Sequence, residues 1–87
     1  MVRLVLYGVL RTAAGRGEME VDAKTAKEAL KMASNLIGGQ APGLVFDAEG
    51  NVYPSILVFR GDRKVVDFDE PLESGEVLTV IPAVEGG

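Results

Sequence analysis

The chain has 87 residues, of which 47% are hydrophobic and 25% are charged, and its formal net charge is -4. This length and composition indicate one globular domain with a modest core rather than a disordered chain. The acidic balance argues against nucleic-acid binding, which needs a clustered basic face, and no apolar stretch is long enough to cross a membrane. Cys and His are both absent, which removes disulfides, thiolate chemistry and the side chain that most often transfers protons near neutral pH. We therefore expect a cytoplasmic domain without catalytic machinery of its own.

Two strands are predicted near the N-terminus. Residues 2–8 are almost continuously apolar, which is typical of a central strand buried on both faces. Residues 18–22 alternate between polar and apolar side chains, which predicts a half-exposed strand paired with the first. The segment between them, residues 9–14, is compatible with a short helical turn.

A single long helix is predicted over residues 25–37. Thr25 and Glu28 have the spacing of a capping box. Apolar residues then recur at intervals of three and four and form one stripe, which comprises Ala26, Ala29, Leu30, Ala33, Leu36 and Ile37. Gly38 and Gly39 follow, and glycine commonly ends a helix.

The second half of the chain is predicted to contain three strands, over residues 55–60, 64–66 and 76–81. Residues 40–53 form a connection, with a short turn of helix around residues 44–46 and a hairpin-like turn at residues 47–51. The strand at 55–60 has apolar side chains on both faces, whereas one helix covers only one face of a sheet. We expect the second face to be partly open and to dock other proteins. The alternative is that the loop of residues 39–54 folds over it.

Other candidate sites are weak. The glycine clusters lack the spacing of a phosphate-binding loop, so any ATP site is expected on another protein. Asp47 and Glu49 belong to a turn that lacks the full pattern of a calcium loop. The acidic residues between 67 and 76 are interpreted as a solvated face or a partner-docking patch, because no apolar pocket is predicted that would raise a carboxyl pKa.

The C-terminal residues are the most informative feature. After the last strand the sequence reads Pro82, Ala83, Val84, Glu85, Gly86 and Gly87. An α-carboxylate is an anion at neutral pH and a poor electrophile, but adenylation by ATP would let a sulfur or amine nucleophile displace AMP. Glycines have no Cβ, so Gly86 and Gly87 suit delivery into a narrow cleft on a partner. We predict a domain of residues 1–82 and a flexible tail of residues 83–87 whose reactive group is the Gly87 carboxylate.

Several motifs carry a family resemblance. They are Tyr7-Gly8-x-x-Arg11-x-x-x-Gly15 after the first strand, Val58-Phe59-Arg60-Gly61, the turn at residues 71–76, and the ending Ile81-Pro82-Ala83-Val84-Glu85-Gly86-Gly87. Together they resemble the MoaD/ThiS family of ubiquitin-like, β-grasp sulfur carriers, and most of all its MoaD branch, the small subunit of molybdopterin synthase. The resemblance implies an α+β fold, the ubiquitin-like β-grasp, with a mixed sheet of about five strands packed on one main helix.

The resemblance also implies a function and partners. In that family the terminal glycine is adenylated, converted to a thiocarboxylate and inserted into the large synthase subunit, where its sulfur reaches the pterin precursor. Gly87 would then carry the sulfur, with residues 82–86 as the segment that contacts partners. Phe59, Arg60 and Leu72 are candidates for a docking face. The implied partners are a MoeB/ThiF-like activating enzyme, which uses ATP, and a MoaE-like large subunit.

This reading makes the chain a carrier rather than an enzyme, with no cofactor, metal, nucleic acid or membrane bound by the chain itself. Many family members have two prolines where this chain has Pro82 and Ala83, which weakens the assignment to molybdopterin or tungstopterin synthesis. The alternatives are a ubiquitin-like protein modifier, a carrier for thiazole synthesis, and a β-grasp interaction module that is never conjugated.

Overall fold

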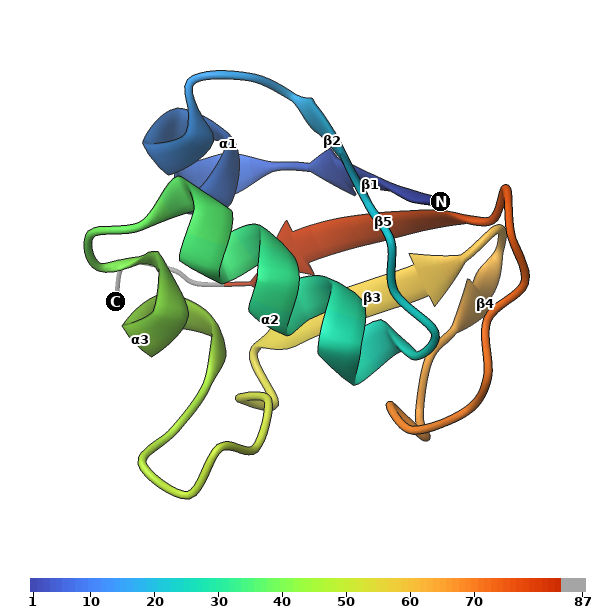
Figure 1. Ribbon diagram of the computed structural model, residues 1–87. Coiled ribbons are helices and arrows are strands. Elements are labelled where there is room, and N and C mark those ends of the chain that lie inside the picture. Colours follow the sequence, from blue (N-terminus) through green and yellow to red (C-terminus); the bar gives the residue numbers. More distant parts are fainter. Residues whose placement is uncertain (84–87) are drawn as a thin grey trace.

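The computed structural model describes residues 1–83, which form a five-stranded sheet with one long helix lying across it (Figure 1). No helix within this range is long and apolar enough to cross a bilayer. The elements in chain order are β1 (Val2–Leu6), α1 (Gly8–Ala14), β2 (Glu18–Val21), α2 (Ala26–Ile37), α3 (Ala41–Val45), β3 (Ile56–Arg60), β4 (Arg63–Lys64) and β5 (Val77–Pro82).

The sheet is mixed, and its strand order is β2-β1-β5-β3-β4. The central strands β1 and β5 run parallel, with Leu4 opposite Leu78, and the other neighbours are antiparallel. The strands at the two ends of the sequence therefore lie side by side at the centre of the sheet. This arrangement, with a helix across one face, is the predicted β-grasp.

Helix α2 is confirmed, and Thr25 caps it. The Thr25 hydroxyl accepts a hydrogen bond from the Glu28 backbone N–H at 3.1 Å. The Glu28 carboxylate reaches back to the N–H of Lys24 at 2.6 Å rather than to that of Thr25, so the two bonds of the capping box span one residue more than the usual motif. Leu36, predicted in the apolar stripe, is 69% exposed. It lies at the edge of the stripe, whereas Ile37, the next residue, packs against the core.

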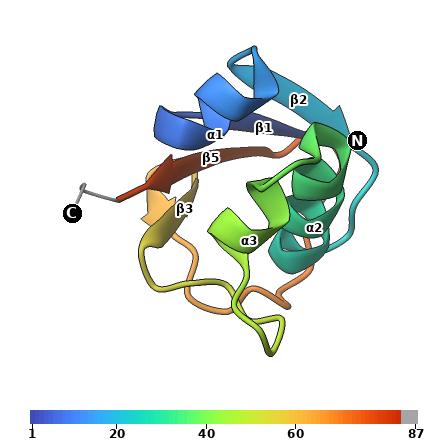
Figure 2. The ribbon, with the colours of Figure 1, turned by 90° about the vertical axis from the view of Figure 1, so that its left-hand side faces the viewer.

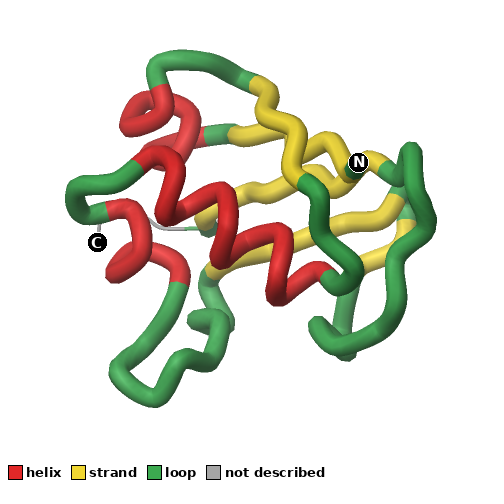
Figure 3. The backbone as a smooth tube through the Cα atoms, viewed as in Figure 1, coloured by secondary structure: helices red, strands yellow, loops and turns green. Residues whose placement is uncertain are grey.

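The two shorter helices close the core on the side of α2. Leu10 of α1 is buried among β1, α2 and β5, so the predicted turn at residues 9–14 is a helix that seals one end of the core. Helix α3 buries Ala41 and Val45 beside α2. Figure 2 shows α2 and α3 on the same side of the sheet, and Figure 3 shows α2 crossing in front of the strands.

The loop of residues 39–54 stays on this helical side. The Tyr53 N–H donates a hydrogen bond to the Val45 carbonyl at 2.9 Å, and Phe46 packs against the core. The hairpin-like turn is held by Asp47, whose carboxylate accepts from the N–H groups of Glu49 and Asn51. The alternative that this loop covers the second sheet face is wrong.

Strand β4 is shorter than predicted. Residues 64–66 were expected to form it, but the strand comprises Arg63 and Lys64. Val65 is buried and donates one hydrogen bond to Val58, after which Val66 is 83% exposed. The chain leaves the sheet at this point because the following loop crosses to the N-terminus of α2, where the Phe68 carbonyl accepts from the Lys27 N–H.

Candidate functional site

The chain reaches its C-terminal segment through β5, which lies between β1 and β3. Hydrogen bonds from both sides hold the end of this strand. The Tyr7 N–H donates to the Val80 carbonyl at 3.2 Å, and the Ala83 N–H donates to the Ser55 carbonyl at 2.6 Å. The direction in which the chain leaves the sheet is therefore fixed as far as Ala83.

Gly8 lies against Pro82, at the point where the chain leaves the end of β5. It has a positive φ of +60°, and a Cβ on it would lie 3.5 Å from Pro82 Cγ, which is an ordinary van der Waals contact. Pro82 itself is half-buried and belongs to β5, whereas Ala83 is exposed. The sequence motif Tyr7-Gly8 thus lies next to the segment that leads to the C-terminus, although about seventy residues separate the two in sequence.

Four of the predicted site residues lie outside the described part of the chain. These are Val84, Glu85, Gly86 and Gly87. The reactive role of Gly87 and the division into a domain and a flexible tail stay predictions. Of the predicted tail, the structure places Pro82 and Ala83 at the end of the central strand.

The sheet face opposite α2 and α3 is uncovered by any other described element, as predicted (Figure 2). The register of β1, β5 and β3 groups six side chains on it, and we call this group the open face: Val5, Leu57, Phe59, Val77, Thr79 and Ile81. Five are half-buried by their neighbours, and Val77 is 42% exposed. Charged residues flank the open face, with Arg3 beside Glu18 and Glu20 on one side and Lys64 opposite Phe59 on the other. Such a rimmed apolar surface is typical of protein docking.

The structure separates the three candidate docking residues. Phe59 lies on the open face, where its register partner is Thr79. Arg60 lies on the other face at the end of β3, where its register partner is Leu78, and Leu72 packs against the core. The three side chains therefore do not form one surface, because successive residues of a strand point to opposite faces.

Arg60 holds the loop that leads into β5. Its Nε and Nη2 atoms donate to the two carboxylate oxygens of Glu76 at 2.8 and 2.6 Å, and its Nη1 atom donates to Glu70 at 3.0 Å. The hydrogen bonds from Arg60, followed by one from the Glu73 N–H, lower the pKa of Glu76 below its ordinary value. Two carboxylates of the acidic segment are thus bound within the domain, which sequence reasoning missed.

The described residues hold no group of three or more acidic side chains arranged to bind a metal ion. One hollow has a volume of about 740 Å³ and lies between α2 and the turn after α3. Its lining mixes Lys27 and Lys31 with Phe46 and Tyr53. It was not predicted, because residues far apart in the sequence form it.

The strand order, the helix across one face and the central strand that leads to a C-terminal Gly-Gly sequence define a ubiquitin-like β-grasp protein. No protein-family model matches the sequence, and a search of curated protein sequences found no match. Solved structures do match. SAMP1 from Haloferax volcanii, small archaeal modifier protein 1, is 27% identical, with 99% of this chain and 98% of that chain covered and a TM-score of 0.85.

Two further structures extend this likeness. A chain of the Amycolatopsis orientalis BexX/CysO complex is 25% identical, with both chains fully covered and a TM-score of 0.79. Urm1 from Sulfolobus solfataricus is 15% identical, covers 92% of this chain and 97% of that chain, has a TM-score of 0.75, and shows the fold alone. The structural neighbours are small ubiquitin-like carrier and modifier proteins rather than catalytic enzymes.

Proposed function

We propose that the chain is a sulfur carrier whose Gly87 carboxylate is adenylated and then thiocarboxylated, and that the sulfur serves molybdopterin or tungstopterin synthesis. The observation that carries the proposal is the end of β5. The central strand delivers Pro82 and Ala83 to the surface, and the sequence from there ends in Gly86 and Gly87. The full-length likeness to SAMP1 and the motifs shared with the MoaD branch support it.

The chemistry needs a separate enzyme that binds ATP and provides the active site. A Gly87 carboxylate oxygen attacks the α-phosphate of ATP, which forms an acyl-adenylate and releases pyrophosphate. Hydrosulfide then attacks the acyl carbon, a C–S bond forms, and the C–O bond to AMP breaks. In this scheme the chain contributes a substrate group, and the fold contributes its presentation.

The partners follow from this scheme. A MoeB/ThiF-like enzyme would adenylate Gly87, and a MoaE-like large subunit would receive the thiocarboxylate. The open face lies beside the strand that leads to the tail, and it offers the apolar area on which either partner would dock. A neighbouring structure is that of a complex, BexX/CysO, which supports the general expectation that such chains act with partner proteins.

Intact-mass spectrometry tests the carrier proposal. The protein is incubated with a MoeB-like activating enzyme, ATP and sodium sulfide, and we expect the mass to rise by the difference between one sulfur and one oxygen atom. A variant with one alanine added after Gly87 is the control, because it keeps the sequence of the folded domain but presents a different terminal residue. An unchanged mass in the parent chain, with an activating enzyme that thiocarboxylates its own carrier, would overturn the proposal.

A second candidate function is protein modification, in which a lysine amine of another protein displaces AMP instead of hydrosulfide. The likeness to small archaeal modifier protein 1 favours this candidate specifically. Both functions require Gly87, so the test is the product formed in cells. Covalent adducts that carry a Gly-Gly remnant on lysine would identify a modifier, and a released thiocarboxylate with no adducts would identify a dedicated carrier.

Thiazole synthesis would use the same thiocarboxylate. It is distinguished from pterin synthesis by adding the large subunit of each pathway in turn to the thiocarboxylated chain. A β-grasp module that is never conjugated would tolerate the added alanine without loss of function.

A further inference from the structure

Within residues 1–83, no strand pairs with the outer edge of β2. Strand β2 is the first strand of the sheet, with β1 as its neighbour on one side only. The Leu6 N–H donates to the Gly17 carbonyl at 2.8 Å, and bonded pairs recur at every second residue of an antiparallel ladder. Met19 and Val21 therefore bond to β1, whereas the N–H and C=O groups of Glu18 and Glu20 point outward.

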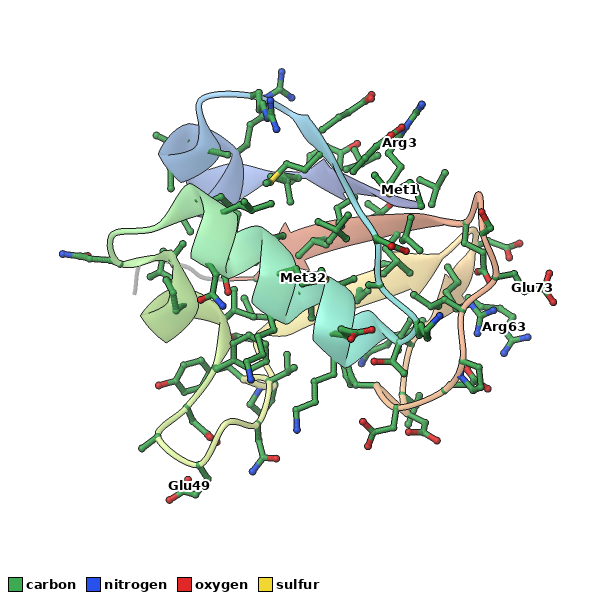
Figure 4. All side chains as sticks on the ribbon, in the orientation of Figure 1. Met1, Arg3, Met32, Glu49, Arg63 and Glu73 are labelled. Carbon is green, nitrogen blue, oxygen red and sulfur yellow. The ribbon has the colours of Figure 1, made fainter. Side chains whose placement is uncertain are left out.

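An apolar groove runs along this edge, between β2 and α2. Its volume is about 440 Å³. Val21, Met32 and Leu36 line it together with Met1 and Asn35, and the carboxylate-bearing Glu20 and Asp22 lie at its β2 rim. Met32 is 37% exposed and Leu36 is 69% exposed, and Met1 beside them is 57% exposed. Figure 4 labels Met1 and Met32 on the two sides of this region. The outward position of Leu36, which amphipathic patterning predicted to be buried, gives the groove its helical wall.

The two faces of the edge differ in chemistry. Met19 and Val21 point toward the helical side, where the groove lies, whereas Glu18 and Glu20 point to the opposite side and are exposed. Arg3 forms ion pairs with Glu18 at 3.8 Å and with Glu20 at 3.5 Å. Arg16 lies beside this cluster, and Asp22 adds a third carboxylate directly after the strand. The Met1 ammonium group donates a hydrogen bond to the Ser74 hydroxyl. The carboxylates thus outnumber the arginines beside them.

We propose that the β2 edge binds an extended segment of another protein in which lysine or arginine alternates with aliphatic residues. An added antiparallel strand would bond to the outward groups of Glu18 and Glu20. Partner residues opposite these glutamates share their face, so basic side chains fit there. The alternate partner residues point to the helical side, where aliphatic side chains enter the groove against Met32 and Leu36.

A second copy of this chain is the wrong occupant for the edge. Antiparallel pairing of two β2 strands about Glu20 places Glu20 opposite Glu20 and Glu18 opposite Asp22. Like charges directly opposite one another destabilise a strand pair. The same carboxylates that repel a second copy attract a basic strand.

The groove lies away from the exit of the C-terminal segment. Strands β1 and β5 are parallel, so Leu6 and Val80 are neighbours at one end, while Met1 and Val21 lie at the other. The open face is also separate, because the groove is on the helical side. A partner on the β2 edge therefore leaves Pro82 and Ala83 accessible, and the proposal does not depend on the chemistry proposed for Gly87.

Fluorescence anisotropy with a labelled, capped peptide of sequence KVKVKVK tests the proposal. We expect saturable binding with a Kd below about 1 mM, and no saturation with KKKKVVV, which has the same composition but no alternation. N-methylation of the two lysines that flank the central valine should abolish binding because their N–H groups face β2, whereas N-methylation of the central valine should preserve it. Equal binding of the two sequences, or loss with methylated valine instead of methylated lysine, would overturn the proposal.

One variant of the β2 strand, one of the groove and one control locate the site. Glu18→Lys combined with Glu20→Lys should weaken binding about tenfold, because two opposite-charge cross-strand pairs become like-charge pairs. Leu36→Asp should weaken it on the helical side without altering the sheet, and Leu44→Asp on α3 is the matched control. ¹⁵N NMR should show shifts at Glu18, Glu20 and Leu36. Shifts on the open face, or concentration-dependent shifts without peptide that indicate self-association, would refute the assignment.

Discussion

Substitution of Gly8 by Ala tests the geometry of the exit from β5, and Gly15→Ala provides a matched control. Both glycines have a positive φ, +60° at Gly8 and +73° at Gly15. A left-handed conformation costs an alanine about 1–2 kcal/mol, and the stiffer unfolded chain returns about 0.4–1 kcal/mol. Each variant should therefore lose about 1 kcal/mol of unfolding free energy, which lowers Tm by about 4–8 °C in a domain of this size.

The two positions differ in what surrounds the new methyl group. At Gly15 nothing lies within 4 Å of an added Cβ, whereas at Gly8 the Cβ would contact Pro82 Cγ at 3.5 Å without a clash. The two variants should thus be equally destabilised in urea titrations, and both should retain the rate of thiocarboxylation. If the Gly8 variant loses about 2 kcal/mol or more of unfolding free energy beyond the Gly15 variant, the added methyl group clashes with Pro82. An unchanged unfolding free energy in both variants would refute the left-handed backbone conformation at these glycines.

Three further outcomes are expected. Thr25→Ala should lower the unfolding free energy by about 1 kcal/mol because it removes the helix cap, and Thr25→Ser should restore it in the same urea titration. Glu76→Gln should be less stable than the parent at neutral pH. The difference in unfolding free energy should shrink as the pH falls below 4.5, the ordinary pKa of this carboxyl group, because a carboxyl group with a lowered pKa loses its stabilisation only as it is protonated. A pH-independent difference would contradict this. Val77→Asp should weaken binding of the activating enzyme about tenfold, because it places a charge in the apolar open face that docking would have to desolvate. Val66→Asp, which is exposed elsewhere, should not weaken binding. Equal effects in calorimetric titrations would remove the open face from the docking surface.

Local patterns predicted the elements that depend on neighbouring residues. Spacing of three and four residues with the Thr25 cap predicted α2, and alternation predicted β2, because both periods follow from backbone geometry. The bounds at Ile56 and Val77 differ from the predictions by one residue. The β-grasp order itself came from the resemblance, since no local pattern specifies that β1 lies beside β5.

Contacts between distant residues were the ones that sequence reasoning missed. Arg60 and Glu76 are 16 residues apart, and nothing in the acidic segment distinguishes the carboxylates that bind Arg60 from those that face solvent. Similarly, Gly8 was noted as part of a motif, but its contact with Pro82 depends on the parallel pairing of the first and last strands. Such contacts follow from the register of the sheet rather than from periodicity.

Leu36 shows how a failed local prediction can point to function. A helix of twelve residues should bury its whole apolar stripe. Ile37 packs against the core, yet Leu36 is exposed and stands beside the outer edge of β2. An exposed leucine alone needs no explanation. Beside unpaired backbone groups and alternating carboxylates, however, it completes a surface that is apolar on one side and acidic on the other. A flat patch would accept many partners, whereas this edge specifies strand direction, alternation and charge, so the test peptides can separate it from nonspecific attraction to an acidic protein.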